Sequence, residues 1–140
     1  MDVFVYGTLT DPDRVAAVLG QTGFVTLGPG RLRGLHRVDG RYPTLSPGGI
    51  VDGRLLRTEH VAALDRYEGV ADGLYIRVSV PYVDRAGDVA VYVGDPDRLE
   101  PAESIDWPGD GQFEERVERY VRENGVVVED RGGDDTEGFG

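Results

Sequence analysis

Short apolar segments interrupted by glycine are the feature that most limits the folds open to this chain. The segments at residues 3–6, 50–56, 75–83 and 89–93 are rich in β-branched and aromatic residues, and the sequence holds 21 glycines. Such segments are typical of strands, and the last two alternate like the strands of a hairpin. Strands outnumber helical segments and only some are separated by helices, which favours a small curled sheet. We therefore predict an α+β fold, a small mixed β-barrel flanked by short helices.

Two further stretches carry less regular strand patterns. Residues 24–38 alternate irregularly between apolar and polar types, and the glycines among them predict several bent strands. Residues 42–45 form a short extended piece, and Gly48 and Gly49 predict a turn that leads into the strand at 50–56. Bends and turns of this kind suit a sheet that curls back toward itself.

Helix signals are few and short. Asp11 and Pro12 are typical of a helix start, because the carboxylate accepts a hydrogen bond from a free N–H group and proline has no N–H group to leave unpaired. Thr58 predicts the cap of a second helix that runs to Tyr67. Residues 113–124 have apolar side chains at helical spacing and predict a third helix.

The length of 140 residues fits a single domain with one core. We place this domain at residues 1–128. Residues 129–140 are rich in glycine and acid and have almost nothing apolar to bury, so we expect them to form an acidic, disordered tail. The sequence leaves the oligomeric state open.

The charge of the chain is strongly one-sided. Its formal net charge is −11, all 15 basic residues are arginine, and cysteine is absent. This composition resembles that of halophilic proteins, in which counter-ions screen the repulsion between carboxylates. No basic stripe is present to neutralise phosphates, so we expect no nucleic-acid partner. Because no apolar stretch approaches the roughly 20 residues of a membrane helix, we expect a cytoplasmic protein without a membrane partner.

The first strand ends in a glycine turn at Tyr6, Gly7, Thr8 and Leu9, just before the expected helix start. Free N–H groups in such a turn, together with the positive end of the following helix, favour a carboxylate or a phosphate. The alternative is an ordinary strand-to-helix connection with Tyr6 packed in the core. The turn lacks the Gly-Lys-Ser/Thr ending of a nucleotide-binding P-loop.

Glu68 stands at the expected C-terminal end of the second helix, between Tyr67 and Gly69. The negative end of a helix disfavours an ionised carboxylate, so a partly buried glutamate there is expected to have a raised pKa. A pKa near neutrality is what a general base requires. The alternative is a solvated acid at a helix end.

Four short segments follow one another in an informative order. They are YGTL at residues 6–9, YPTL at 42–45, VDGRL at 51–55, and LDRYEG at 64–69 followed by YIR at 75–77. In this order they resemble the YG(S/T)L, YPAL, V-x-G-x-L and LD-x-x-EG…Y-x-R motifs of the gamma-glutamylcyclotransferase superfamily, with its AIG2-like and gamma-glutamylamine cyclotransferase branches. The resemblance spans residues 3–93.

The resemblance implies a compact β-barrel in which the YGTL loop faces Glu68 across a cavity. Glu68 is then the catalytic acid/base. The residues that line the substrate site are Tyr6, Gly7, Thr8, Leu9 and Tyr75. The implied substrate is a small γ-glutamyl amine or γ-glutamyl amino acid, which cyclises to 5-oxoproline and releases an amine without a cofactor or a metal ion.

Several other side chains have two interpretations each. Tyr75 either presents its hydroxyl to the cavity or is an edge-strand aromatic, and Arg77 either attracts a substrate carboxylate or pairs with a surface acid. Trp107 is interpreted as a packing or lid residue, with a chemical role as the alternative. His36 and His60 fall on different expected elements without a ligand-spaced partner, which argues against a zinc site or a Ser-His pair.

Two functions other than an enzyme fit the same sequence. The first is a non-catalytic domain that binds a small carboxylate in the same pocket, because a shared fold does not guarantee shared chemistry. The second is an acidic interaction module, which rests on the net charge and the tail alone.

Overall fold

The computed structural model describes residues 1–101 and 103–131. Its strands are β1 (Asp2–Val5), β2 (Val25–Val38), β3 (Thr44–Arg57), β4 (Tyr75–Pro81), β5 (Asp88–Gly94) and β6 (Val127–Asp130). Its α-helices are α1 (Pro12–Leu19), α2 (Val61–Tyr67), α3 (Pro96–Leu99) and α4 (Phe113–Glu123), and the 3₁₀ helices η1 (Thr8–Thr10) and η2 (Val70–Asp72) add one turn each.

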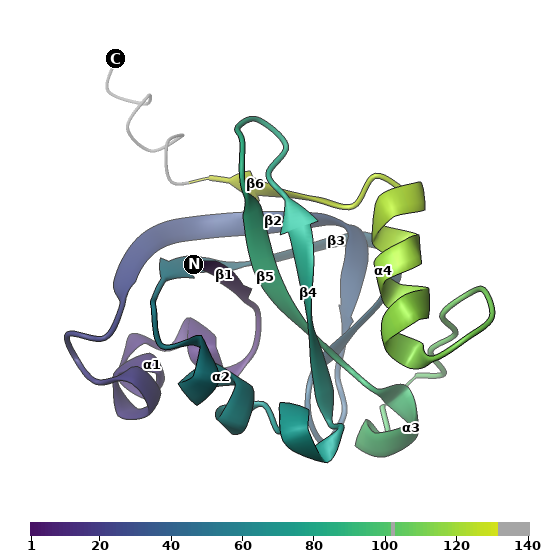
Figure 1. The fold of residues 1–140 in the computed structure, drawn as a ribbon, viewed down its shortest axis with the longest axis horizontal. Helices are drawn as coiled ribbons and strands as arrows, with labels where there is room; N and C mark the ends of the chain where they lie inside the picture. Colours follow the sequence, from purple (N-terminus) through teal and green to yellow (C-terminus); the bar gives the residue numbers. More distant parts are fainter. Residues whose placement is uncertain (102, 132–140) are drawn as a thin grey trace.

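All of these strands belong to one mixed sheet in the order β4-β5-β1-β3-β2-β6. β1 runs parallel to β5, and the other neighbouring pairs are antiparallel. The two outer strands meet just beyond β4, where Tyr82 forms a bridge with Val128 and the N–H group of Val83 donates to the Val128 carbonyl at 3.0 Å. The sheet therefore curls into a partly closed barrel with helices around it (Figure 1), which confirms the expected fold class.

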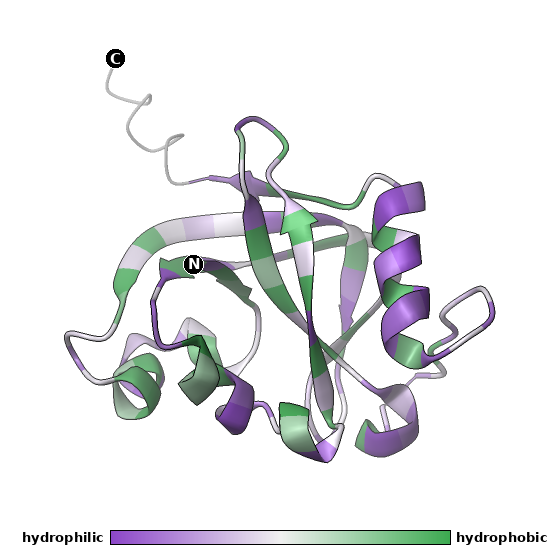
Figure 2. Ribbon diagram, viewed as in Figure 1, coloured by the Kyte–Doolittle hydropathy of each residue, from purple (hydrophilic) through white to green (hydrophobic). Residues whose placement is uncertain are grey.

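Both faces of the sheet are buried around β1 and β5. Phe4 and Tyr6 belong to the larger core cluster, which fills the inside of the barrel and includes residues of α4. Val3 and Val5 point to the opposite face, where they pack against residues of α1 and α2. This arrangement explains why the first strand is apolar without alternation. Helix α4 covers the barrel with one face only, and Figure 2 shows hydrophilic residues over much of the rest of its surface.

The long strands β2 and β3 differ from the prediction of shorter pieces. β2 is one strand with two shifts of register, and Gly28 and Gly34 adopt positive φ angles at these shifts. Gly48 and Gly49 do not form a turn between two strands. They have φ angles of 93° and 81° inside β3, which pairs with β2 on both sides of them. The glycines form a bulge that bends a continuous strand, so the expected turn was wrong.

Helix starts follow the sequence in one case and depart from it in another. Asp11 caps α1 by accepting a hydrogen bond from Asp13 N at 3.0 Å. The same four residues, Asp-Pro-Asp-Arg, recur at 95–98 and start α3, which the sequence analysis did not predict. Thr58 is not the cap of α2. Its hydroxyl binds the Gly23 carbonyl at 2.6 Å and accepts from His60 N, and the helix begins only at Val61.

The C-terminal boundary of the folded part lies beyond residue 128. Glu129 and Asp130 belong to β6, which pairs with β2, and Arg131 N donates to the Pro29 carbonyl at 3.0 Å. The expectation of a tail from residue 129 was therefore wrong for these residues, because they complete the edge of the sheet. Residues 132–140, the remainder of that expected tail, lie outside the described part of the chain.

Candidate active site

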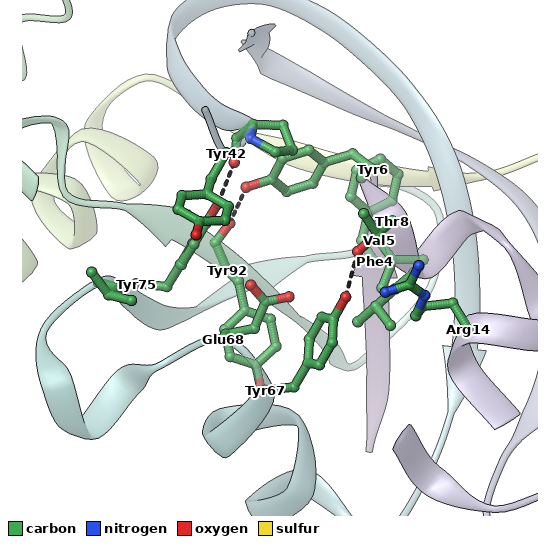
Figure 3. Close-up of a pocket in the computed structure, with 14 residues that line it drawn as sticks. Phe4, Val5, Tyr6, Thr8, Arg14, Tyr42, Tyr67, Glu68, Tyr75 and Tyr92 are labelled. Atoms are coloured by element: carbon green, nitrogen blue, oxygen red, sulfur yellow. Dashed lines mark hydrogen bonds between the residues drawn. The ribbon is translucent and has the colours of Figure 1, made fainter. Parts of the chain in front are cut away.

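A cavity of about 390 Å³ opens at the end of β1 (Figure 3). The end of β1, the following loop, α1, the segment before β3, the end of α2 and strands β4 and β5 all contribute to its wall. The residues that line it are Phe4, Val5, Tyr6, Gly7, Thr8, Leu9, Arg14, Tyr42, Pro43, Tyr67, Glu68, Leu74, Tyr75 and Tyr92. All six residues expected at the site from the sequence are among them.

In the loop at residues 6–9, the carbonyls of Gly7 and Thr8 have hydrogen-bond partners, whereas the N–H groups of residues 7–9 have none among the described residues. The carbonyls of Gly7 and Thr8 accept hydrogen bonds from backbone N–H groups three residues later, at 3.1 and 3.2 Å. Within residues 1–101 and 103–131, the N–H groups of Gly7, Thr8 and Leu9 donate none of the hydrogen bonds found. A Cβ at Gly7 would lie 3.0 Å from Pro43 Cγ, so a side chain there would press against the opposite wall. The loop thus offers three backbone donors at the cavity.

Glu68 is the residue after the last turn of α2, and its N–H group still donates to the Leu64 carbonyl at 2.9 Å. Gly69 then takes a left-handed conformation with φ of 69°, which ends the helix. Figure 3 shows the Glu68 carboxylate directed into the cavity. Burial raises the pKa of Glu68 from 4.5 to about 7. The raised pKa agrees with the sequence argument, but its cause is desolvation, whereas that argument relied on the helix end as well.

Tyrosine rings supply much of this burial. Five of the seven tyrosines in the chain line the cavity. The hydroxyl groups of four of them bind other partners, namely Tyr6 to Tyr92 O (2.5 Å), Tyr75 to Pro43 O (2.5 Å), Tyr92 to Asp65 Oδ1 (2.7 Å) and Tyr67 to Thr8 Oγ1 (2.7 Å). No hydrogen bond to the Glu68 carboxylate occurs among the described residues, so its burial is not offset by a donor.

The hydroxyls of Tyr6, Tyr75 and Tyr92 are neutral near pH 7. Burial raises the pKa of Tyr6, Tyr75 and Tyr92 above its ordinary value of 10. The nearby Glu68 carboxylate raises these pKa values further, since a second negative charge in the cavity is unfavourable. Of the titratable groups lining the cavity, Glu68 is therefore the one whose raised pKa lies near neutrality.

The two interpretations of Tyr75 are both correct in part. Tyr75 begins β4, an outer strand of the sheet, and its ring lines the cavity while its hydroxyl binds the Pro43 carbonyl. Arg77 is not part of the lining, and its guanidinium pairs with Asp65 at 3.4 Å. Trp107 is a packing residue that is 2% exposed and makes edge contacts with the rings of Phe113 and Tyr120.

Several lining residues were not predicted as site residues. Tyr42 and Pro43 belong to the YPTL segment, so the resemblance could have indicated them. Tyr67 precedes Glu68 directly, and its hydroxyl is joined to that of Thr8 at 2.7 Å. Arg14 carried no signal in the sequence, because an arginine in the first turn of a helix is usually a surface residue.

Metal and membrane sites have no support in the described residues. No group of three or more histidine, aspartate or glutamate side chains there could hold a metal ion. None of the helices in this part of the chain is long and apolar enough to cross a membrane.

A comparison with protein-family models matches residues 3–109 to the family described as gamma-glutamyl cyclotransferase, AIG2-like. The chain belongs to this family. The match covers the sheet from β1 to β5 and every residue that lines the cavity. A comparison with curated proteins gave no match.

Solved structures show that the fold is shared. A structure described as a gamma-glutamyl cyclotransferase aligns with a TM-score of 0.59 and 21% identity, covering 89% of this chain and 80% of that one. The Arabidopsis thaliana protein At5g39720.1 is 29% identical, with a TM-score of 0.51 and coverage of 88% and 84%. An uncharacterized protein from Homo sapiens is 18% identical, with a TM-score of 0.55 and coverage of 87% and 98%.

The segments that resemble the gamma-glutamyl cyclotransferase motifs converge in this member of the family. YGTL, the first half of YPTL, the end of LDRYEG and Tyr75 all contribute to the cavity wall. The VDGRL segment lies in β3 beside β1, and a Cβ at its Gly53 would come within 2.2 Å of the Val5 carbonyl oxygen. Gly53 thus lets β3 approach the strand that carries the loop.

Proposed function

We propose that this cyclotransferase-family protein converts a small γ-glutamyl amine or γ-glutamyl amino acid into 5-oxoproline and a free amine, with Glu68 as the general acid/base. The observation that carries the proposal is a desolvated carboxylate, directed into a cavity that is also lined by Gly7, Thr8 and Leu9, whose N–H groups donate none of the hydrogen bonds found in the described residues. A pKa of about 7 lets Glu68 both accept and return a proton at neutral pH.

The proposed reaction is an intramolecular attack. The α-amino nitrogen of the glutamyl group loses a proton to Glu68 and attacks the γ-carbonyl carbon, which forms the new C–N bond of a five-membered ring. The bond from that carbon to the leaving nitrogen then breaks, and Glu68 returns the proton to this nitrogen. The products are 5-oxoproline and the amine, and Glu68 ends in its initial state. Holding one folded substrate conformer supplies much of the acceleration.

The backbone donors of Gly7, Thr8 and Leu9 suit the two anionic groups of this reaction. One is the α-carboxylate of the substrate, and the other is the oxyanion that develops at the γ-carbonyl. N–H groups without internal partners need no rearrangement before they donate to either group. The cavity volume of about 390 Å³ lies within the range of small-molecule sites.

Activity measurements test the proposal directly. A panel of γ-glutamyl amines and γ-glutamyl amino acids is incubated with the protein at high salt, and 5-oxoproline is measured. Glu68→Gln removes the base with little change of size, so we expect kcat to fall by about 10²–10⁴-fold. Glu118→Gln, which removes an exposed carboxylate from α4, is the matched control and should keep full activity.

The pH profile gives a second readout. Because Glu68 must be ionised to accept the proton, kcat/KM should fall about tenfold for each pH unit below about 7. Undiminished product formation in Glu68→Gln would remove Glu68 from the base role. A γ-glutamyl compound that binds without any turnover across the panel would instead indicate a non-catalytic binding domain.

A further inference from the structure

Arg14 is a positive charge in the cavity wall that the proposed reaction does not use. It lies in the first turn of α1 and lines the same cavity as Glu68. Among the hydrogen bonds and ion pairs found in the described residues, none involves its guanidinium. Seven other arginines are paired with acids. In a chain with a net charge of −11, an unpaired guanidinium at a cavity is available for an anion from solution.

The position of Arg14 indicates which part of a substrate it meets. Figure 3 shows its side chain on one side of the Thr8–Tyr67 pair and the Glu68 carboxylate on the other. The hydroxyls of Thr8 and Tyr67 are joined at 2.7 Å, so these two side chains mark a boundary between the two ends of the cavity. The glutamyl group must occupy the end near Glu68, because its α-amino nitrogen gives up a proton there. Glu68 also returns the proton to the leaving nitrogen, so it is the substituent on this nitrogen that extends away from Glu68, toward the end of the cavity where Arg14 lies.

We propose that Arg14 binds a carboxylate on the leaving amine, so that the preferred substrates are γ-glutamyl amino acids or peptides and not simple γ-glutamyl amines. This inference rests on the proposed function and selects between the two substrate classes that it allows. A guanidinium binds a carboxylate through two parallel N–H···O bonds, which an uncharged amide cannot match. Arg14 is thus a specificity-determining residue, while Glu68 performs the proton transfers.

Two compounds of nearly equal shape test this inference. γ-Glutamyl-alanine carries a carboxylate on its leaving amine, and γ-glutamyl-alaninamide carries a neutral amide in the same place. At a fixed ionic strength, the wild-type protein should favour the first by about tenfold in kcat/KM. Arg14→Gln should lose this preference through a higher KM for γ-glutamyl-alanine, with less than about a twofold change for the amide. Arg14→Lys should restore part of it.

Arg98→Gln is the matched control. Arg98 occupies the same position in the second Asp-Pro-Asp-Arg segment, is also exposed, and does not line the cavity. Its substitution changes the net charge equally, so it should leave the preference intact. An equal loss on both compounds in Arg14→Gln would place Arg14 at the glutamyl group and overturn the inference. No change on either compound would overturn it as well.

A binding measurement separates this inference from the proposed function. If neither compound yields 5-oxoproline, the proposed function fails, and calorimetric titration of both compounds then tests Arg14 alone. Tighter binding of γ-glutamyl-alanine than of its amide, lost in Arg14→Gln, would support the carboxylate site without turnover. Equal affinity for the two compounds in the wild-type protein would overturn it.

Discussion

Glu68→Gln should make the protein more stable at pH 8 while it abolishes the proposed chemistry. The burial that raises the pKa of Glu68 to about 7 also makes the ionised form costly in the folded state. Between pH 4.5 and 7 the folded state holds the proton of Glu68 more tightly than the unfolded state does. The free energy of unfolding therefore falls as pH rises through this window, and the cost is complete above pH 7.

The size of this stability cost follows from the difference between the pKa of Glu68 in the unfolded state and its pKa in the folded state. A rise from 4.5 to about 7 corresponds to about 3 kcal/mol at pH 8, with less than about 1 kcal/mol at pH 5. Glutamine has a similar shape and no charge, so it avoids this cost. We expect Glu68→Gln to raise the free energy of unfolding by up to about 3 kcal/mol at pH 8, and by much less at pH 5.

Urea unfolding of the wild-type protein and the variant at pH 5 and pH 8, at one salt concentration, measures both differences. Glu118→Gln separates this effect from a general relief of negative charge, because Glu118 is exposed on α4. Its change in unfolding free energy should be small at both pH values. A Glu68→Gln protein no more stable than wild type at pH 8 would refute the claim that desolvation sets the pKa of Glu68.

Two smaller predictions concern the walls of the cavity and the sheet behind it. Tyr67→Phe removes the exposed 2.7 Å bond to Thr8, so we expect a KM about threefold higher at unchanged kcat. A fall in kcat larger than the rise in KM would contradict this. Gly53→Ala should prevent folding in a circular-dichroism assay, because its Cβ would lie 2.2 Å from the Val5 carbonyl oxygen. Gly48→Ala meets no atom within 4 Å, has a φ of 93°, and should cost only about 1–2 kcal/mol in urea unfolding.

The parts of the fold that local sequence determines were predicted well. The apolar run of β1, the Asp11 cap of α1 and the glycine after Glu68 each act through their nearest neighbours. Gly48 and Gly49 misled the prediction because a glycine pair fits a turn and a bulge equally well. The long partner strand β2 decides in favour of the bulge, and strand pairing is a long-range property.

The residues of the candidate site differ in the same way: some are indicated by short sequence motifs, and others only by how the elements pack. The YGTL loop and Glu68 were found because each belongs to a short, recognisable motif. Arg14 was missed because only the packing of α1 beside the loop brings its guanidinium to the cavity. Arg77 belongs to a motif and was a candidate for binding a substrate carboxylate. Its guanidinium instead pairs with Asp65. Motifs thus indicate which residues to examine, while the packing of helices on the sheet decides which charges reach the cavity.

The environment of Glu68 explains how a strongly acidic chain keeps a carboxyl group with a pKa near 7. The sequence has 26 acidic residues, yet no neighbouring charge contributes to the raised pKa of Glu68. Burial alone raises it, and a hydroxyl donor to the carboxylate would act against burial by stabilising the ionised form. The surrounding tyrosines provide rings that exclude water, while four of their hydroxyls are bound to other partners. These hydrogen bonds therefore help to keep the pKa of Glu68 high, since each one directs a donor away from its carboxylate.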